Sequence, residues 1–133
     1  EFIKTIQIPK PQKGQSLKLY KISKRLDDDI SAVLAAFFIE QDNQHRVITA
    51  RLAFGGMAAI PKRALTAEAA LLNGSFDMSS IEQSKLALNQ DFKPMTDVRA
   101  SDEYRMKVAQ NLLEKCYLEL SSSIIETRVV NYA

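Results

Sequence analysis

The chain has 133 residues, of which 46% are hydrophobic and 26% charged, and its formal net charge is +2. This length suits one packed domain, and the composition is that of a soluble globular protein. No apolar run approaches the roughly 20 residues that a membrane span needs, so we expect no contact with a membrane. The small net charge argues against nucleic-acid binding, and we interpret the lysines of the first quarter as a solvated surface, with docking of an acidic partner as the alternative.

Cys116 is the only cysteine and His45 the only histidine. The chain alone therefore cannot build an internal disulfide, a zinc cluster or a cysteine-ligated iron–sulfur centre, and a reducing, cytoplasmic setting fits best. The sequence begins with Glu1 rather than methionine and shows no signal-peptide pattern. We expect it to be a piece of a longer protein.

Extended segments are expected in the first half of the chain. Residues 2–8 contain β-branched side chains and end at "PKP", which predicts a strand followed by a loop. Residues 17–22 interleave apolar and lysine side chains, which indicates a strand with one face in water. The run 30–41 fits a buried strand or a buried helix by its period alone. The turn sequence "DNQH" and the similar run 46–54 after it favour an antiparallel hairpin.

Helices are expected in the second half. "TAEAALLN", from Thr66, predicts a short helix that ends near Gly74. Ser79 and Glu82 have the spacing of a capping box, which predicts the start of a second helix. A third helix is predicted after Ser101. Its buried stripe recurs at spacings of three and four: Val108, Ala109, Leu112, Leu113, Cys116 and Leu120.

Strands first and helices after predict an α+β fold. We expect an antiparallel sheet of three to four strands followed by about three helices packed on one face, as a two-layer sandwich. Residues 1–122 are assigned to this one domain, and residues 123–133 to a tail without an assignment.

Few residues suggest chemistry of their own. His45 lies in the expected hairpin turn and is interpreted as solvated, and Cys116 lies on a buried stripe and is interpreted as a packed core thiol. The run from Asp27 to Asp29 lacks the spacing of a calcium loop, so we interpret it as a turn whose carboxylates bond backbone amides or the neighbouring Lys24 and Arg25. No catalytic residue and no metal ligand is expected in this chain.

The pair Gly55 and Gly56 ends the apolar run "RLAF". Glycine is expected there if the backbone needs a positive φ, or if a ligand or another domain approaches too closely for a Cβ. A tight turn and a ligand-facing loop are equally compatible with this pattern. "GGMA" has the spacing of neither a Walker loop nor a dinucleotide fingerprint, so it does not cradle phosphates by itself.

Three segments in a fixed order resemble one known family: "KISKRLDDDISAV", "RLAFGGMAAIPKRA" and "DVRASDEYRMKVAQNLL". Together they are similar to the C-terminal domain of the FAD-binding subunit of the molybdenum hydroxylases, as in bacterial xanthine dehydrogenase small subunits and the carbon monoxide dehydrogenase flavoprotein. The resemblance covers residues 2–120. It departs from the family in having three aspartates where two acidic or polar residues are more usual.

The resemblance implies a domain that packs beside the flavin ring, while preceding FAD-binding domains hold the pyrophosphate. Ile30 would sit near the isoalloxazine, and the loop of Phe54, Gly55, Gly56 and Met57 would approach it. These five residues are the expected cofactor-binding set. Lys24 and Arg25 would take the places of the family's basic pair.

The resemblance also implies a parent enzyme of purine catabolism. It would hydroxylate a purine at a molybdenum cofactor in one subunit and pass electrons through an iron–sulfur domain to FAD and on to NAD. By this reading the isolated 133-residue chain is inactive. The alternative is a non-catalytic interaction or dimerisation module that uses the last helix and the apolar sheet.

Overall fold

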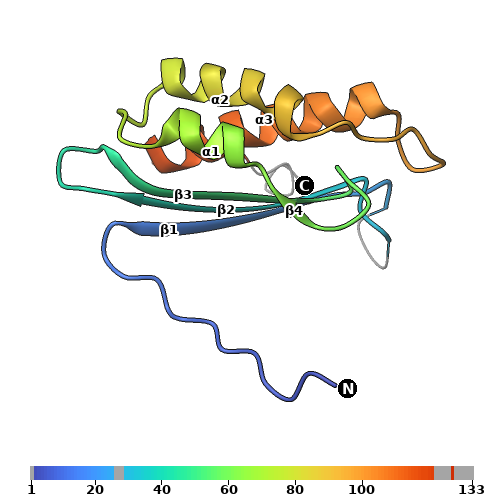
Figure 1. Ribbon diagram of the computed structural model, residues 1–133, viewed down its shortest axis with the longest axis horizontal. Coiled ribbons are helices and arrows are strands. Elements are labelled where there is room, and N and C mark those ends of the chain that lie inside the picture. Colours follow the sequence, from blue (N-terminus) through green and yellow to red (C-terminus); the bar gives the residue numbers. More distant parts are fainter. Residues whose placement is uncertain (1, 26–28, 122–126, 128–133) are drawn as a thin grey trace.

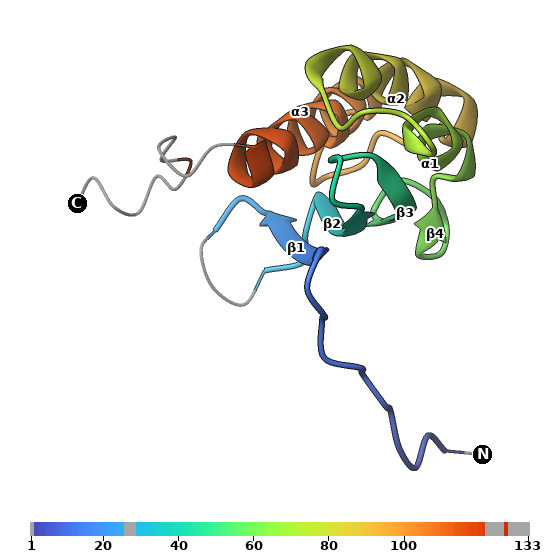
Figure 2. The ribbon, with the colours of Figure 1, turned by 90° about the vertical axis from the view of Figure 1, so that its left-hand side faces the viewer.

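A computed structural model describes residues 2–25, 29–121 and 127. Within these residues the chain forms four strands and three helices (Figure 1): β1 (Gln15–Ile22), β2 (Val33–Gln41), β3 (Val47–Gly55), β4 (Lys62–Arg63), α1 (Leu65–Leu71), α2 (Met78–Asp91) and α3 (Asp102–Ser121). The strands lie in the order β1-β2-β3-β4, each antiparallel to its neighbour. All three helices cover the same face of the sheet (Figure 2). The predicted α+β two-layer arrangement is confirmed.

The central strand β2 shows why the sheet has one wet and one buried face. Val33, Ala35, Phe37 and Ile39 alternate along it and are almost completely buried beneath the helices, whereas Leu34 points to the opposite face and is 46% exposed. Side chains alternate between the two faces of a strand, so only every second residue of β2 can be buried in the core beneath the helices. The prediction of a strand here, which rested on the turn sequence after residues 30–41, is therefore confirmed.

The hairpin between β2 and β3 forms at the expected turn. Asp42 Oδ1 accepts hydrogen bonds from the backbone N–H groups of Gln44 at 2.8 Å and Arg46 at 3.0 Å. His45 has a φ of 58° and is exposed. The interpretation of His45 as a solvated turn residue is confirmed.

The helix predicted from Thr66 is α1, and its N-terminus is capped by a residue from another helix. The carboxylate of Asp91, the last residue of α2, accepts from the backbone N–H groups of Thr66 at 3.0 Å and Ala67 at 2.9 Å. Two of the amides that a helix start leaves without intrahelical partners are thereby satisfied, and the carboxylate complements the helix dipole. This cap also fixes α1 against the end of α2.

The predicted capping box of α2 was wrong by two residues. The helix starts from Asp77, whose side chain accepts from Ser80 N at 2.9 Å, and Ser80 Oγ accepts from Asp77 N in return. Glu82 instead pairs with Lys85 at 2.6 Å. Aspartate and serine caps compete closely in energy, so the spacing alone could not choose between them.

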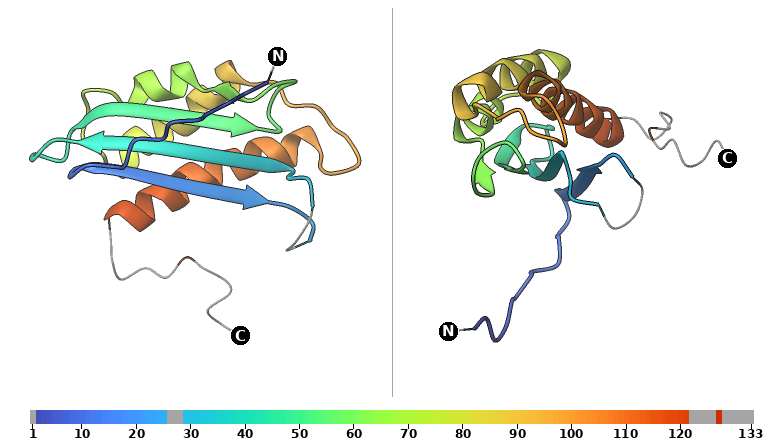
Figure 3. Two further views of the ribbon diagram at one scale, coloured as in Figure 1. Left: turned by 90° about the horizontal axis from the view of Figure 1, so that it is seen from below. Right: turned by 90° about the vertical axis from the view of Figure 1, so that its right-hand side faces the viewer.

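Helix α3 places its predicted stripe against the sheet. Ala109, Leu112, Leu113 and Cys116 are at most 5% exposed, and Figure 3 shows α3 running behind β1 and β2. The packed-core interpretation of Cys116 is confirmed, because its thiol is buried and burial raises its pKa to about 12. Within the described residues, no helix combines the length and the apolar character that crossing a bilayer requires.

The strand predicted over residues 2–8 is not formed. This segment runs away from the body of the domain (Figures 1 and 2), and the exposed fractions of Phe2, Ile3, Ile6 and Ile8 are 74–88%. A strand needs a partner for its backbone N–H and C=O groups, and no other strand of the described chain pairs with these residues. A strand-like composition was therefore insufficient.

Two other predictions fall at the limits of the described residues. Asp27 and Asp28 lie outside them, while Asp29 forms an ion pair with Arg25 at 3.6 Å, in agreement with the expected turn. The assigned tail, residues 123–133, also lies outside them except for Thr127. The boundary at residue 122 stays a prediction.

Candidate functional site

The candidate site is an open pocket of about 480 Å³ at the end of β3. Its lining comes from three segments and one helix residue: residues 30–34 at the start of β2, residues 55–59 at and after the end of β3, residues 93–99 before α3, and Arg105 of α3. Leu34 and Gly55 are paired across the sheet, and this pair brings the first two segments together. We call residues 55–59 the glycine loop.

The structure divides the five expected site residues into two groups. Ile30, which is 65% exposed, lines the pocket together with Gly55 and Gly56. Phe54 and Met57 are 1% and 0% exposed and belong to the core beneath the helices. Phe54 stacks edge-on with Phe37 and Phe92 at centroid distances of 5.2 and 5.4 Å. The pocket wall therefore contains three of the five, and the cofactor-binding role of all five stays a prediction.

The two glycines of the loop differ in what requires them. Gly56 has a φ of +80°, and a Cβ there would overlap the carbonyl oxygen of Ala32. Gly55 has no positive φ, and a Cβ there would make only ordinary contacts, the nearest at 3.5 Å to Leu34. The fold itself thus explains Gly56. It does not explain Gly55.

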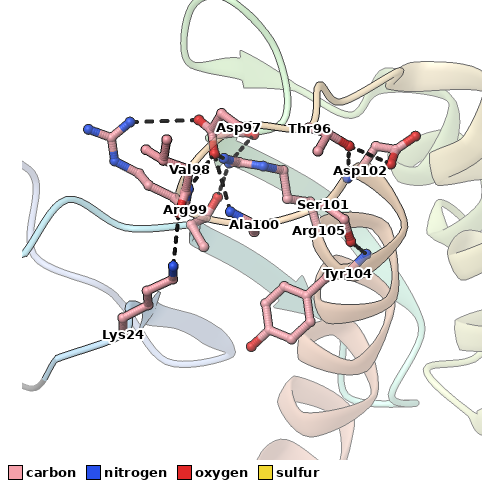
Figure 4. Close-up of polar contacts among 12 residues, drawn as sticks. Lys24, Thr96, Asp97, Val98, Arg99, Ala100, Ser101, Asp102, Tyr104 and Arg105 are labelled. Carbon is pink, nitrogen blue, oxygen red and sulfur yellow. Dashed lines mark hydrogen bonds and ion pairs between the residues drawn. The ribbon is translucent and has the colours of Figure 1, made fainter.

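A buried arginine on α3 holds the pocket's segments together. Arg105 is 3% exposed, and its Nη1 donates to the carbonyl oxygens of Ala32 and Gly56, the latter at 2.9 Å. Its Nη2 donates to Asp97 Oδ1 at 2.6 Å (Figure 4). One guanidinium thus bridges the start of β2, the glycine loop and the segment before α3. We call this arrangement the Arg105 clasp.

Asp97 is fixed by its own loop as well as by Arg105. The same Oδ1 accepts from the backbone N–H groups of Arg99 at 2.8 Å and Ala100 at 3.2 Å. These amides, Arg99 first, and the guanidinium of Arg105 outweigh the effect of desolvation and lower the pKa of Asp97 to about 2. Lys24 adds a tie to the same loop by donating to the carbonyl oxygen of Val98 at 2.8 Å (Figure 4). The carboxylate is therefore ionised at neutral pH.

The sequence carried a signal for Arg105 that our prediction did not use. Arg105, Ala109, Leu112 and Cys116 follow one another at spacings of four, three and four, so they share one face of α3. A charged side chain on an apolar stripe is rarely buried without a partner. That partner, Asp97, stood eight residues earlier in the same quoted segment.

The arrangement can position a ligand but offers little chemistry of its own. His45 is in the hairpin at the far end of β3, and the raised pKa of Cys116 keeps its buried thiol protonated at neutral pH. Within the described part of the chain, no group of three or more histidine, cysteine, aspartate or glutamate side chains is placed to hold a metal ion. The pocket combines an apolar wall with the charged side chains of Lys93, Asp97, Arg99 and Arg105.

Comparison with known proteins assigns the fold to a family. Residues 18–120 match the family model of the CO dehydrogenase flavoprotein C-terminal domain. The chain belongs to this family. The resemblance drawn from three ordered segments, to the C-terminal domains of flavin subunits in the molybdenum hydroxylases, is confirmed.

Two curated relatives are longer than this chain. It is 36% identical over 125 residues to a xanthine dehydrogenase of Emericella nidulans, and the match covers 92% of this chain and 9% of that relative. It is 30% identical over 111 residues to a putative xanthine dehydrogenase FAD-binding subunit of Escherichia coli, and the match covers 84% of this chain and 38% of that subunit. The chain thus spans well under half of either relative.

Solved structures share the fold. Carbon monoxide dehydrogenase from Hydrogenophaga pseudoflava superposes with a TM-score of 0.73 at 22% identity, over 81% of this chain and 37% of that one. Quinoline 2-oxidoreductase from Pseudomonas putida 86 gives a TM-score of 0.67 at 22% identity, over 84% of this chain and 38% of that one. At these identities the likeness concerns the fold alone.

Proposed function

We propose that this chain is the C-terminal domain of the FAD-binding part of a xanthine dehydrogenase-like molybdenum hydroxylase, and that it packs beside the flavin. The proposal is supported by its family and by two relatives that are named xanthine dehydrogenase or its FAD-binding subunit. The remaining partners would be the preceding FAD-binding domains, an iron–sulfur domain and a molybdenum-binding subunit. Such an enzyme would act in cytoplasmic purine catabolism.

Gly55 is the observation that carries the proposal. Neither its backbone conformation nor its surroundings within the described chain demand a glycine. The fold of the domain would tolerate a side chain at this position. The presence of glycine is explained if a flat ligand from outside the domain packs against the end of β3. Its position on the pocket wall beside Ile30 and Leu34 supports this explanation.

The residues of the pocket fit the ring of FAD rather than its phosphates. Ile30, Leu34 and Met95 offer an apolar wall, and Lys93 and Arg99 offer positive charge for the polar edge of an isoalloxazine. The pocket is open, and the glycine loop lacks the spacing of a phosphate-binding loop. The parts of the protein outside this chain would therefore hold the pyrophosphate.

This chain would contribute binding and orientation to the reaction. Bound FAD would supply the electron transfer between iron–sulfur clusters and NAD. Ile30, Leu34 and Gly55 would exclude water from one side of the ring, while Lys93 and Arg99 would bias its electrostatics. We assign no proton transfer and no covalent step to the described side chains of the site, so we expect the isolated 133-residue chain to have no turnover.

The test uses the full-length protein that contains these residues. We expect about one FAD per chain in the unmodified protein. Gly55→Val should lower FAD affinity about tenfold or more, because the new side chain would occupy the face offered to the ring. Gly74→Val is the matched control, since Gly74 pairs with Val47 at the opposite end of β3 and its Cβ would also be tolerated. A colourless full-length protein would overturn the proposal, as would unchanged FAD affinity in Gly55→Val.

A second candidate function is a protein-interaction module. It is favoured by the outer face of the sheet, where Leu17, Leu19 and Leu34 are 46–68% exposed. Leu19→Lys should then abolish binding of a partner without changing flavin content. The flavin-packing proposal predicts instead that FAD content responds to Gly55 in the assay above.

A further inference from the structure

Arg105 occupies a place where an apolar side chain would suit the fold. It lies on the buried face of α3 in line with Ala109, Leu112 and Cys116, and only 3% of it is exposed. Burying a charge is costly, and replacing a buried ion pair by packed apolar residues is often neutral or stabilising. The domain's stability alone is therefore a poor reason for an arginine here.

The arginine is also incompletely satisfied. Its two terminal nitrogens have partners in Ala32, Gly56 and Asp97, but among the described residues its Nε is buried without one. A buried N–H group without a partner destabilises the folded state, because it has lost its hydrogen bonds to water. The side chain therefore keeps the hydrogen bonds of its terminal nitrogens although this leaves its Nε–H without a partner.

The two carbonyl partners belong to two of the three segments that line the pocket. Ala32 lies between Ile30 and Leu34, and Gly56 is the second residue of the glycine loop. The sheet pairing between these segments ends at the pair of Leu34 and Gly55. Arg105 adds a bridge one step beyond that last pair, at the point where the loop leaves the sheet.

Few other contacts hold the loop from Gly56 to Pro61. In the part of the chain that the structure describes, the bond from Arg105 to the Gly56 carbonyl is the only hydrogen bond recorded for these six residues. The fully buried side chain of Met57 anchors the loop to the core. Because this side chain is flexible, it does not fix the orientation of the loop, and another contact is needed for that. The guanidinium supplies such a contact.

We propose that Arg105, held in place by Asp97, is a positioning residue that sets the orientation of the glycine loop against the flavin ring. This inference rests on the function proposed above. Arg105 also lines the pocket, and we assign it the role of setting the pocket's geometry through the glycine loop rather than through a bond to the ring. The planar guanidinium is required because it donates to two carbonyls and a carboxylate at once. A lysine carries the same charge but presents a single ammonium on a flexible stem, so it cannot reproduce the fork.

The experiment compares three variants in the full-length flavoprotein. Arg105→Lys keeps the charge, Arg105→Met keeps the apolar stem, and Asp97→Asn keeps the shape of the anchor but removes its charge. Lys107→Met is the control, because Lys107 is an exposed cation two residues further along the same helix. The readouts are the FAD dissociation constant, the visible circular dichroism and reduction potential of the bound flavin, and hydrogen exchange at residues 56–60.

We expect Arg105→Met and Arg105→Lys to weaken FAD binding about tenfold to hundredfold, the equivalent of one or two charge-assisted hydrogen bonds. The flavin's dichroism and potential should shift as well, while amides of residues 56–60 exchange about tenfold faster and those of β2 and β3 are unchanged. Asp97→Asn should give smaller shifts of the same sign. Lys107→Met should leave every readout as in the unmodified protein.

The outcomes separate this proposal from the one it rests on. A colourless unmodified protein overturns both. An unmodified protein with FAD, together with Arg105 variants that lose only thermal stability and keep the flavin's affinity and spectrum, overturns the positioning role alone. If Arg105→Met fails to fold, Arg105→Lys and Asp97→Asn still decide, because unchanged flavin properties in those two variants contradict the proposal.

Discussion

Gly56 lies so close to Ala32 that a Cβ on the glycine would overlap the carbonyl oxygen of the alanine. That carbonyl accepts a hydrogen bond from Arg105, which also donates to the carbonyl of Gly56. The two backbones are thus drawn together by one side chain from α3. A glycine with a φ of +80° allows the loop to turn there without a side chain in the way.

The first prediction concerns stability at this contact. Gly56→Ala should lower the free energy of unfolding by roughly 2 kcal/mol or more, because a side chain at positive φ is strained and the overlap with Ala32 forces the backbone apart. Urea denaturation of the wild type and variant measures the difference. Gly74→Ala, where φ is not positive and the nearest atom to the new Cβ is 3.7 Å away, should change stability by no more than about 0.5 kcal/mol. Equal losses in both variants would contradict this account.

The second prediction is that the stability of the domain depends strongly on the buried side chain of Glu68. It is 4% exposed and accepts from Leu52 N at 2.8 Å and from Arg63 Nη2 at 2.5 Å. Glu68→Ala leaves the buried N–H group of Leu52 without its partner and should cost about 2–3 kcal/mol in urea denaturation. The control is Glu82→Ala. The carboxylate of Glu82 is exposed, and its partner Lys85 keeps a second ion pair with Glu114, so this substitution should matter by less than about 0.5 kcal/mol. Comparable effects of the two substitutions would refute the ranking.

The extended N-terminal segment gives a third prediction. Residues 2–9 are exposed and contribute no strand, so removing residues 1–9 should shift the melting temperature of the domain by no more than about 2 °C. Removing residues 1–22 also deletes β1 and the buried Tyr20, and should abolish cooperative unfolding. Circular dichroism melts distinguish the two truncations. A large loss from the shorter truncation would show that the segment packs on the domain.

Local patterns were enough to predict most of the fold. For residues 30–41 the period alone left strand and helix open, and the turn sequence with the similar run after it predicted the strand correctly, while the three-and-four spacing of α3 predicted its buried face. Residues 2–8 have a strand-like composition, yet they form no strand, because pairing depends on a neighbour that the described chain does not provide. The two-residue strand β4 was hidden because so short a segment next to Pro61 has no period.

The candidate site was predictable only in outline. The glycine pair drew attention to the right place, but the sequence could not separate Gly55 from Gly56, since the difference lies in one φ angle and in the approach of Ala32. The burial of Phe54 and Met57 depends likewise on which face of the strand end meets the helices. Such features arise from tertiary contacts and leave no local pattern.

Cys116 should be chemically silent in the folded protein. Burial, more than any neighbour, raises the pKa of its thiol to about 12, so the reactive thiolate is nearly absent at pH 8. We expect alkylation by iodoacetamide to be at least about a hundredfold slower in the native protein than in urea, because reaction must await unfolding. Mass spectrometry follows the modification. Rapid labelling of the native protein would mean that α3 opens far more readily than its packing implies.

The last prediction concerns the acid sensitivity of Asp97. Its folded pKa of about 2 lies below the ordinary value of 3.8, so the unfolded chain binds the proton more tightly than the folded one. The stability that Asp97 contributes is therefore fully present above about pH 5 and is lost as the pH falls from about 4 towards 2.

Several other carboxylates with lowered pKa values titrate in the same window, Glu119 among them, so the measurement must isolate Asp97. The difference in unfolding free energy between wild type and Asp97→Asn does so, because the other groups contribute equally to both. This difference should be constant from about pH 5 to 8 and should shrink steadily below pH 4. A difference that does not vary between pH 5 and pH 2 would show that the contacts to Arg105 and the Arg99 amide do not favour the ionised form.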